Sequence, residues 1–183
     1  MLFLFSTIYH TFNCHSNEVW QCCYKLDLTG IMFSLIAATI CSLELMFHNF
    51  DYIRKIYVYI FLCLGLLIVI LSMFDLFISA KFNLFIIFLY ASMFLISFLS
   101  TIHWVCIADM HEVELMSKYI LFGEGFLFLG FTIFLSKFPE CLFQHKIIDY
   151  FFQSHIMWHL CCVGCAVSYY LMMYNYNKLI HNK

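Results

Sequence analysis

Residues 56–74 read IYVYIFLCLGLLIVILSMF, a run without a single charged side chain that follows Arg54 and Lys55. An α-helix rises about 1.5 Å per residue, so about 20 apolar residues cross the ~30 Å hydrocarbon core of a bilayer. The run has this length and this character. It therefore predicts a membrane-spanning helix.

Four further apolar runs extend the pattern along the chain. They cover residues 28–47, 82–108, 119–136 and 150–176, whereas the apolar residues 1–12 are too few to span and predict a partial helix. No linker or low-complexity segment interrupts the chain, so we expect a single transmembrane domain over residues 1–183. The predicted fold class is all-α: an integral membrane helical bundle of about five full spans plus a half-helix.

The composition supports this fold class. Hydrophobic residues make up 64% of the 183 residues and charged residues 11%, and the mean hydropathy is +0.91. Soluble domains are about 45–50% apolar and about 25% charged, so a soluble enzyme, a disordered tail and a secreted disulfide-rich domain are excluded. A net charge of −2 gives no basic surface for nucleic acid. Membrane lipid is the expected partner.

Counting spans places three segments at one membrane face. If residues 13–27 connect the half-helix to the first full span on the same side, alternation brings the start of the last span, near Tyr150, back to that face. The Lys and Arg residues do not orient the bundle, because four fall on this face and five on the other.

Four ionisable residues are predicted at a similar depth near this face: His10, Asp27, His155 and His159. His10 lies four residues after Ser6, and His159 four residues after His155, so each pair shares one helix face. Two histidines at this spacing can bind one ion. Three neutral imidazoles leave one position of a zinc ion open for water, which Asp27 would hold or deprotonate.

Two other interpretations remain open from these residues alone. The histidines can be hydrogen-bonded packing residues, or His10 and a histidine of the last span can be axial ligands of a b-type haem. The presence of Asp27 and the count of three histidines argue against haem. Ionisable groups are costly inside a bilayer, which favours a functional site over packing.

Three stretches together resemble the progestin and adipoQ receptor family, which is related to hemolysin III. They are STIYHTFNCHS (6–16), KLDLTGI (25–31) and FQSHIMWH (152–159), and SKFPE (136–140) is similar to the segment before the family's last helix. Their order and spacing agree with the family across nearly the whole chain. The resemblance implies seven helices with a cytoplasmic amino terminus, so we expect this chain to lack the first helix and most of the second.

The resemblance also implies roles for the polar residues. His10, His155 and His159 would be the ligands of a Zn²⁺ ion near the cytoplasmic face. Asp27 would bind the zinc-held water as general base, and Ser6, one turn from His10, would donate a hydrogen bond to its neighbours or to substrate. Asp27 and Ser6 are thus the predicted catalytic residues.

The function implied by the resemblance is that of a multi-pass receptor. It would hydrolyse ceramide-like lipid amides and respond to a hormone or steroid ligand. The alternative is a non-catalytic scaffold or signalling receptor with structural zinc. Either would lie in the plasma membrane or the Golgi membrane.

Overall fold

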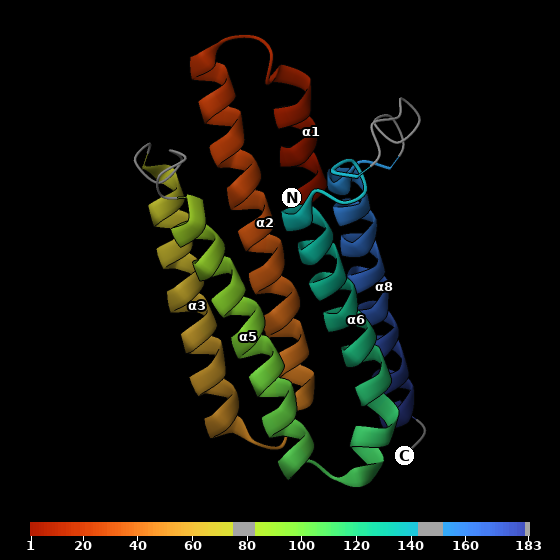
Figure 1. Ribbon diagram of the computed structural model, residues 1–183. Coiled ribbons are helices and arrows are strands. Elements are labelled where there is room, and N and C mark those ends of the chain that lie inside the picture. The colour runs from red at the N-terminus through yellow and green to blue at the C-terminus, as the bar shows by residue number, and fades with distance from the viewer. Residues whose placement is uncertain (75–82, 143–151, 182–183) are drawn as a thin grey trace. The chain divides into compact units, whose positions relative to one another are not determined.

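A computed structural model of the chain describes residues 1–74, 83–142 and 152–181, and the regular structure in these ranges is helical (Figure 1). The elements are α1 (Leu2–Phe12), α2 (Asn17–Met46), α3 (Asp51–Met73), α5 (Asn83–Ile107), α6 (Met110–Ser136) and α8 (Ser154–His181). Among the described residues, all of these except α1 are long and apolar enough to cross a membrane. The predicted all-α membrane fold is confirmed.

The chain forms two compact units, Met1–Ser100 and Thr101–Lys183. The first contains α1, α2, α3 and most of α5. The second contains the end of α5 together with α6 and α8. Each unit is described on its own.

In the first unit, α1 packs against the amino-terminal half of α2 (Figure 1). Gly30 permits this close approach, because a Cβ atom there would lie 2.9 Å from Cδ2 of Phe5. Aromatic rings extend the contact: Tyr9 lies against Tyr24 with ring centroids 5.7 Å apart, and Trp20 stacks on Tyr24 at 5.4 Å. The α1–α2 pair is therefore held by side chains along its length.

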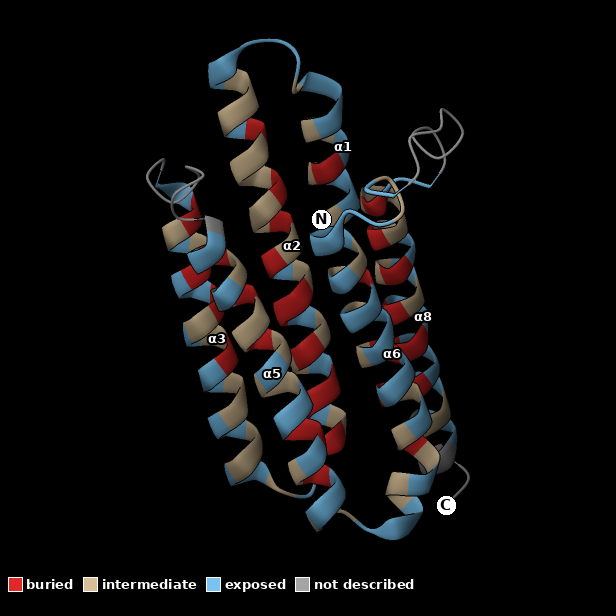
Figure 2. Ribbon diagram, viewed as in Figure 1, coloured by how far each residue is buried: buried red, intermediate tan, exposed pale blue. Residues whose placement is uncertain are grey.

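A helical stripe of α3 faces α2. Its buried residues are Phe61, Gly65, Ile68 and Ser72, spaced at intervals of three and four residues, and Figure 2 shows buried positions along both helices. Gly65 leaves room for the side chain of Ile36. Small residues at such crossings let membrane helices approach closely, which is the main source of their packing energy.

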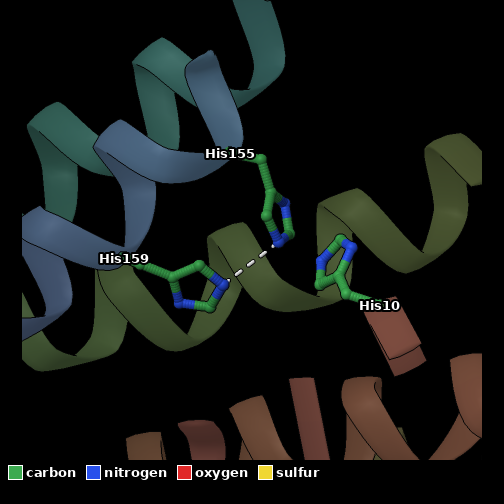
Figure 3. Close-up of side chains that lie close together, drawn as sticks. All are labelled: His10, His155 and His159. Carbon is green, nitrogen blue, oxygen red and sulfur yellow. Dashed lines mark hydrogen bonds between the residues drawn. The ribbon is translucent and has the colours of Figure 1, made fainter. Parts of the chain in front are cut away.

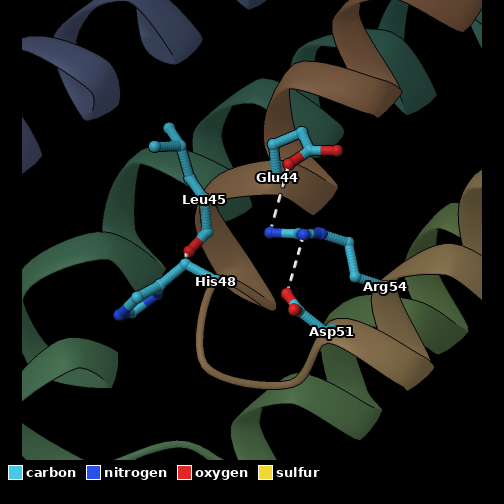
Figure 4. Close-up of polar contacts among 5 residues, drawn as sticks. All are labelled: Glu44, Leu45, His48, Asp51 and Arg54. Atoms are coloured by element: carbon cyan, nitrogen blue, oxygen red, sulfur yellow. Dashed lines mark hydrogen bonds and ion pairs between the residues drawn. The ribbon is translucent and has the colours of Figure 1, made fainter.

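Arg54, near the start of α3, forms one ion pair with the end of α2 and one within α3 (Figure 4). Arg54 lies 3.3 Å from Glu44 of α2 and 2.7 Å from Asp51, which precedes it by three residues. His48, in the connecting turn, lies 3.0 Å through Nδ1 from the carbonyl oxygen of Leu45. Both carboxylates are more than half exposed, so water screens these pairs.

We expect Arg54→Ala to lower the free energy of unfolding by less than about 1 kcal/mol, because exposed ion pairs contribute little. Thermal denaturation in detergent measures the change, and Lys55→Ala is the matched control, since the described residues give Lys55 no ion pair. A loss of several kcal/mol would contradict this assignment of the pairs as screened surface contacts.

In the second unit, α6 and α8 pack along most of their length. Glycines mark the closest approaches. Gly123 faces Tyr169, Gly130 faces Cys161 and Trp158, and Gly164 of α8 faces Phe126. The amide of Asn175 donates a hydrogen bond of 3.0 Å to the Tyr119 hydroxyl. This pairing sets the orientation of the α8 turns that carry the histidines.

Two helices begin earlier than the apolar runs indicate. α2 begins at Asn17 rather than at residue 28, because the Ser16 hydroxyl accepts a hydrogen bond from Val19 N at 3.3 Å and caps the helix. α6 begins at Met110 rather than at residue 119, after the N-cap Asp109. The connection expected over residues 13–27 is thus mostly helical. The predicted starts of the third and last spans, at Phe82 and Tyr150, lie outside the described residues.

Candidate functional site

Two histidines meet on the first turns of α8. Nε2 of His155 lies 3.1 Å from Nε2 of His159, and the two rings stand nearly perpendicular with centroids 4.7 Å apart (Figure 3). Both residues are partly buried. Phe134, near the end of α6, contacts both His155 and Trp158. The predicted pairing of these two imidazoles across one helical turn is present in the structure.

The distance between the two Nε2 atoms fits either a hydrogen bond between the rings or a metal ion bound by both. Without a cation, one ring must donate its N–H to the other. With a cation, both nitrogens turn lone pairs toward it: two ligands about 2.0–2.1 Å from a tetrahedral zinc ion lie about 3.3 Å apart. The observed 3.1 Å is close to that value. The separation of the two nitrogens is therefore compatible with a shared metal ion as well as with a hydrogen bond.

Three predicted site residues come together in the first unit. The carboxylate of Asp27 accepts a hydrogen bond from the Ser6 side chain and lies within electrostatic range of the His10 imidazole. Ser6 and Asp27 are 4% and 5% exposed, whereas His10 is exposed near the end of α1. The contact between α1 and α2 thus brings together a hydroxyl, a carboxylate and an imidazole.

One oxygen of the Asp27 carboxylate makes no hydrogen bond with the described residues. Asp27 Oδ1 is buried and has no hydrogen-bond partner among the described residues. A buried acceptor without a partner costs about 1–3 kcal/mol, and more when it is charged. Such atoms in native proteins often mark a place for an ordered water, an ion or a substrate. The chemistry of Asp27 therefore fits a water held beside a metal.

A second carboxylate, that of Glu140, contacts the start of α8 from outside that helix. Glu140 accepts hydrogen bonds from both the backbone N–H of Ser154, at 2.7 Å, and the Ser154 hydroxyl. Burial by itself raises the pKa of Glu140, but the Ser154 hydrogen bonds and the Lys137 ammonium outweigh it and hold the pKa below its usual value. Glu140 is thus an ionised carboxylate at neutral pH.

A separate polar contact lies within the second unit. The Thr101 hydroxyl donates a hydrogen bond of 2.8 Å to Glu124 of α6. Thr101 was not foreseen, because a threonine in an apolar run of α5 gives no sign of which helix it will face.

A family model described as "Haemolysin-III related" matches residues 1–170. The chain belongs to the haemolysin-III related family. The resemblance that the sequence motifs indicated is therefore confirmed, and this member of the family is a multi-pass membrane protein.

Two relatives of this haemolysin-III related chain carry receptor names. It is 26% identical over 167 residues to "Progestin and adipoQ receptor-like protein 1" of Caenorhabditis elegans, and 26% identical over 168 residues to "Adiponectin receptor protein" of Drosophila melanogaster. The matches cover 90% and 91% of this chain. The chain spans 38% of the length of each relative.

The sequence predicted the His155–His159 pairing of this haemolysin-III related protein but not the contact between Glu140 and Ser154. Spacing by four residues was sufficient to predict the His155–His159 pair. The SKFPE segment (136–140) resembles the family, but the sequence predicted no role for Glu140. A role was not predictable, because its partner, Ser154, is distant in sequence and no periodicity links the two.

Proposed function

We propose that this chain is the zinc-binding part of a multi-pass membrane receptor, with its site near the cytoplasmic face. Within that site the receptor hydrolyses ceramide-like lipid amides. The observation that carries the proposal is the His155–His159 pair, whose ring nitrogens are separated by a distance suited to one metal ion.

His10 is proposed as the third ligand. The three histidines each offer one ring nitrogen, a donor set typical of catalytic zinc, in which a fourth position stays open. Span counting from the sequence puts the end of α1 and the start of α8 at the same membrane face. Exposure of His10 near the end of its helix leaves its imidazole accessible for such a role.

Asp27 and Ser6 are proposed to do the proton chemistry. A zinc ion bound by the imidazoles would supply Lewis-acid activation of water and of the amide carbonyl. Asp27 would take up a proton at its unpartnered Oδ1, while Ser6 holds the carboxylate in a fixed orientation. Burial of both side chains keeps competing water away from the carboxylate.

The substrate and the ligand follow from the family and from the setting. The long apolar helices of the chain favour a lipid amide that enters from the bilayer. The receptor names of the two relatives support a hormone or steroid ligand. The membrane-spanning helices and the receptor names of the relatives support a membrane location, which we propose to be the plasma membrane or the Golgi membrane.

A non-catalytic receptor or scaffold is the second candidate. It is favoured by the hydrogen bond between Ser6 and Asp27, which also joins α1 to α2 and therefore has a structural use. In this alternative, zinc stabilises the helices and Asp27 only orders the packing.

Asp27→Asn separates the two candidates. We expect zinc stoichiometry to stay unchanged, because imidazoles hold the metal, while release of fatty acid from ceramide in proteoliposomes falls by about 10²–10⁴-fold, the usual contribution of a general base. Metal analysis and fatty-acid release are measured on the same preparations. Glu18→Gln, an exposed carboxylate in the first turn of α2, is the matched control.

Two results would decide against catalysis by Asp27. Equal ceramide turnover in Asp27→Asn and in the unsubstituted chain would remove its role as base. A zinc-loaded chain that never turns over ceramide would favour the non-catalytic receptor.

A further inference from the structure

We infer that Glu140 is a positioning residue for the histidine pair: its carboxylate anchors the first turn of α8 and thereby fixes where His155 and His159 stand. Neither the family description nor the sequence motifs give Glu140 a role. The anchoring stands on the structure alone, whereas its consequence for zinc rests on the proposed function.

The amino-terminal end of α8 needs an external acceptor. The first N–H groups of any helix have no partner within the helix. In α8 the first intrahelical bond runs from Met157 N to the Gln153 carbonyl at 3.0 Å, so the N–H of Ser154 is one of these donors. Glu140 accepts that N–H at 2.7 Å and also accepts the Ser154 hydroxyl. A single carboxylate thus satisfies both donors of one residue.

The charge of Glu140 strengthens the anchor. A helix carries a partial positive charge at its amino terminus, where an anionic side chain is stabilising. Hydrogen bonds to an ionised carboxylate are about twice as strong as those between neutral groups. The lowered pKa of Glu140 agrees with a carboxylate that these donors and Lys137 keep ionised.

Glu140 is itself held in place at the end of α6. Lys137 adopts a left-handed conformation with φ of 51° and ends that helix. The next turn is closed by hydrogen bonds from Cys141 N to the Lys137 carbonyl, at 2.8 Å, and from Leu142 N to the Pro139 carbonyl, at 3.0 Å. The carboxylate is therefore presented from an ordered turn that continues directly from α6.

Ser154, the residue that Glu140 holds, is close to the two histidines along the chain. His155 follows Ser154 directly, and His159 stands one turn further on the same face. Phe134 of α6 contacts the His155 ring at 5.8 Å between centroids. The end of α6 thus constrains the pair twice, once through a side-chain contact and once through the backbone of α8.

Amide hydrogen exchange on the purified full chain, without added metal, tests the anchor. We expect Glu140→Ala to speed exchange of the amides of residues 154–158 by about tenfold, the usual effect of losing a helix cap. Glu140→Gln keeps one acceptor oxygen without the charge, so an intermediate rate is expected. Glu114→Gln, an exposed carboxylate on α6, is the control and should leave these amides unchanged.

A double-mutant cycle and a metal titration complete the test. Because the Ser154 hydroxyl bonds only through Glu140 in this scheme, Ser154→Ala should add little exchange to Glu140→Ala. Zinc titration should show a dissociation constant raised by about 10–100-fold in Glu140→Ala, as for other residues that orient metal ligands.

The outcomes are distinct. Faster exchange with weaker zinc binding supports the inference. Unchanged exchange in Glu140→Ala overturns the anchor, and faster exchange with unchanged zinc affinity overturns the positioning role. If the unsubstituted chain binds no zinc but exchange accelerates, the proposed zinc function fails and the anchor itself is supported.

Discussion

His155→Ala is expected to lower the affinity of the chain for zinc at least a hundredfold. Structural zinc sites with four ligands bind with about 10–16 kcal/mol, so loss of one imidazole removes roughly 3 kcal/mol or more. Each 1.4 kcal/mol corresponds to a factor of ten in the dissociation constant. The expected loss is the same for His159→Ala, since each of the two residues is proposed to supply one ring nitrogen to the metal.

Competition titration against a zinc-binding dye measures this loss. His111→Ala, an exposed histidine in the first turn of α6, is the matched control and should bind as the unsubstituted chain does. His10→Ala tests the third proposed ligand in the same assay. Zinc affinity that is unchanged in His155→Ala would show that the pair is a hydrogen-bonded contact between neutral rings.

Gly130→Ala is expected to lower the free energy of unfolding by about 1–3 kcal/mol. A Cβ atom at position 130 would lie 2.7 Å from Cβ of Cys161 and 3.0 Å from Cε3 of Trp158. Cβ of Cys161 is bonded directly to the α8 backbone, so it cannot move aside as a flexible side-chain tip would. The two helices must separate, and membrane helices depend on close packing for their association.

The same helix offers the control. Gly125 is exposed, and a Cβ atom there would meet nothing within 4 Å. Gly125→Ala should therefore be neutral or stabilising by up to about 1 kcal/mol, since alanine favours a helix more than glycine does. Thermal denaturation in detergent compares the two variants. Equal melting temperatures would contradict the α6–α8 packing described above.

The fold was largely predictable because the bilayer imposes one simple requirement. A run such as 56–74 has to be helical to satisfy its backbone in hydrocarbon, and α3 is found there. The helix starts were less predictable. Residues 17–27 contain several polar and charged side chains, so the uncharged run that predicts the span starts only after them, at residue 28. The cap at Ser16 extends α2 through them.

The sequence predicted only those parts of the candidate site in which the residues lie close together on one helix. Ser6 with His10 and His155 with His159 follow from helical geometry at a spacing of four. The hydrogen bond between Ser6 and Asp27 depends on how α1 packs on α2, through Gly30 and Phe5, which no short pattern reveals. Glu140 illustrates the same limit, because its contact with Ser154 joins two ends of different helices.

X-ray absorption at the zinc K-edge of the purified, zinc-loaded chain identifies the atoms that bind the metal. We predict three imidazole nitrogens and one oxygen at about 2.0–2.1 Å from the metal. The chain has ten cysteines, three of them on α8 beyond His159, at positions 161, 162 and 165. A shell containing sulfur at about 2.3 Å, or a chain that retains no zinc, would contradict a histidine-bound metal centre.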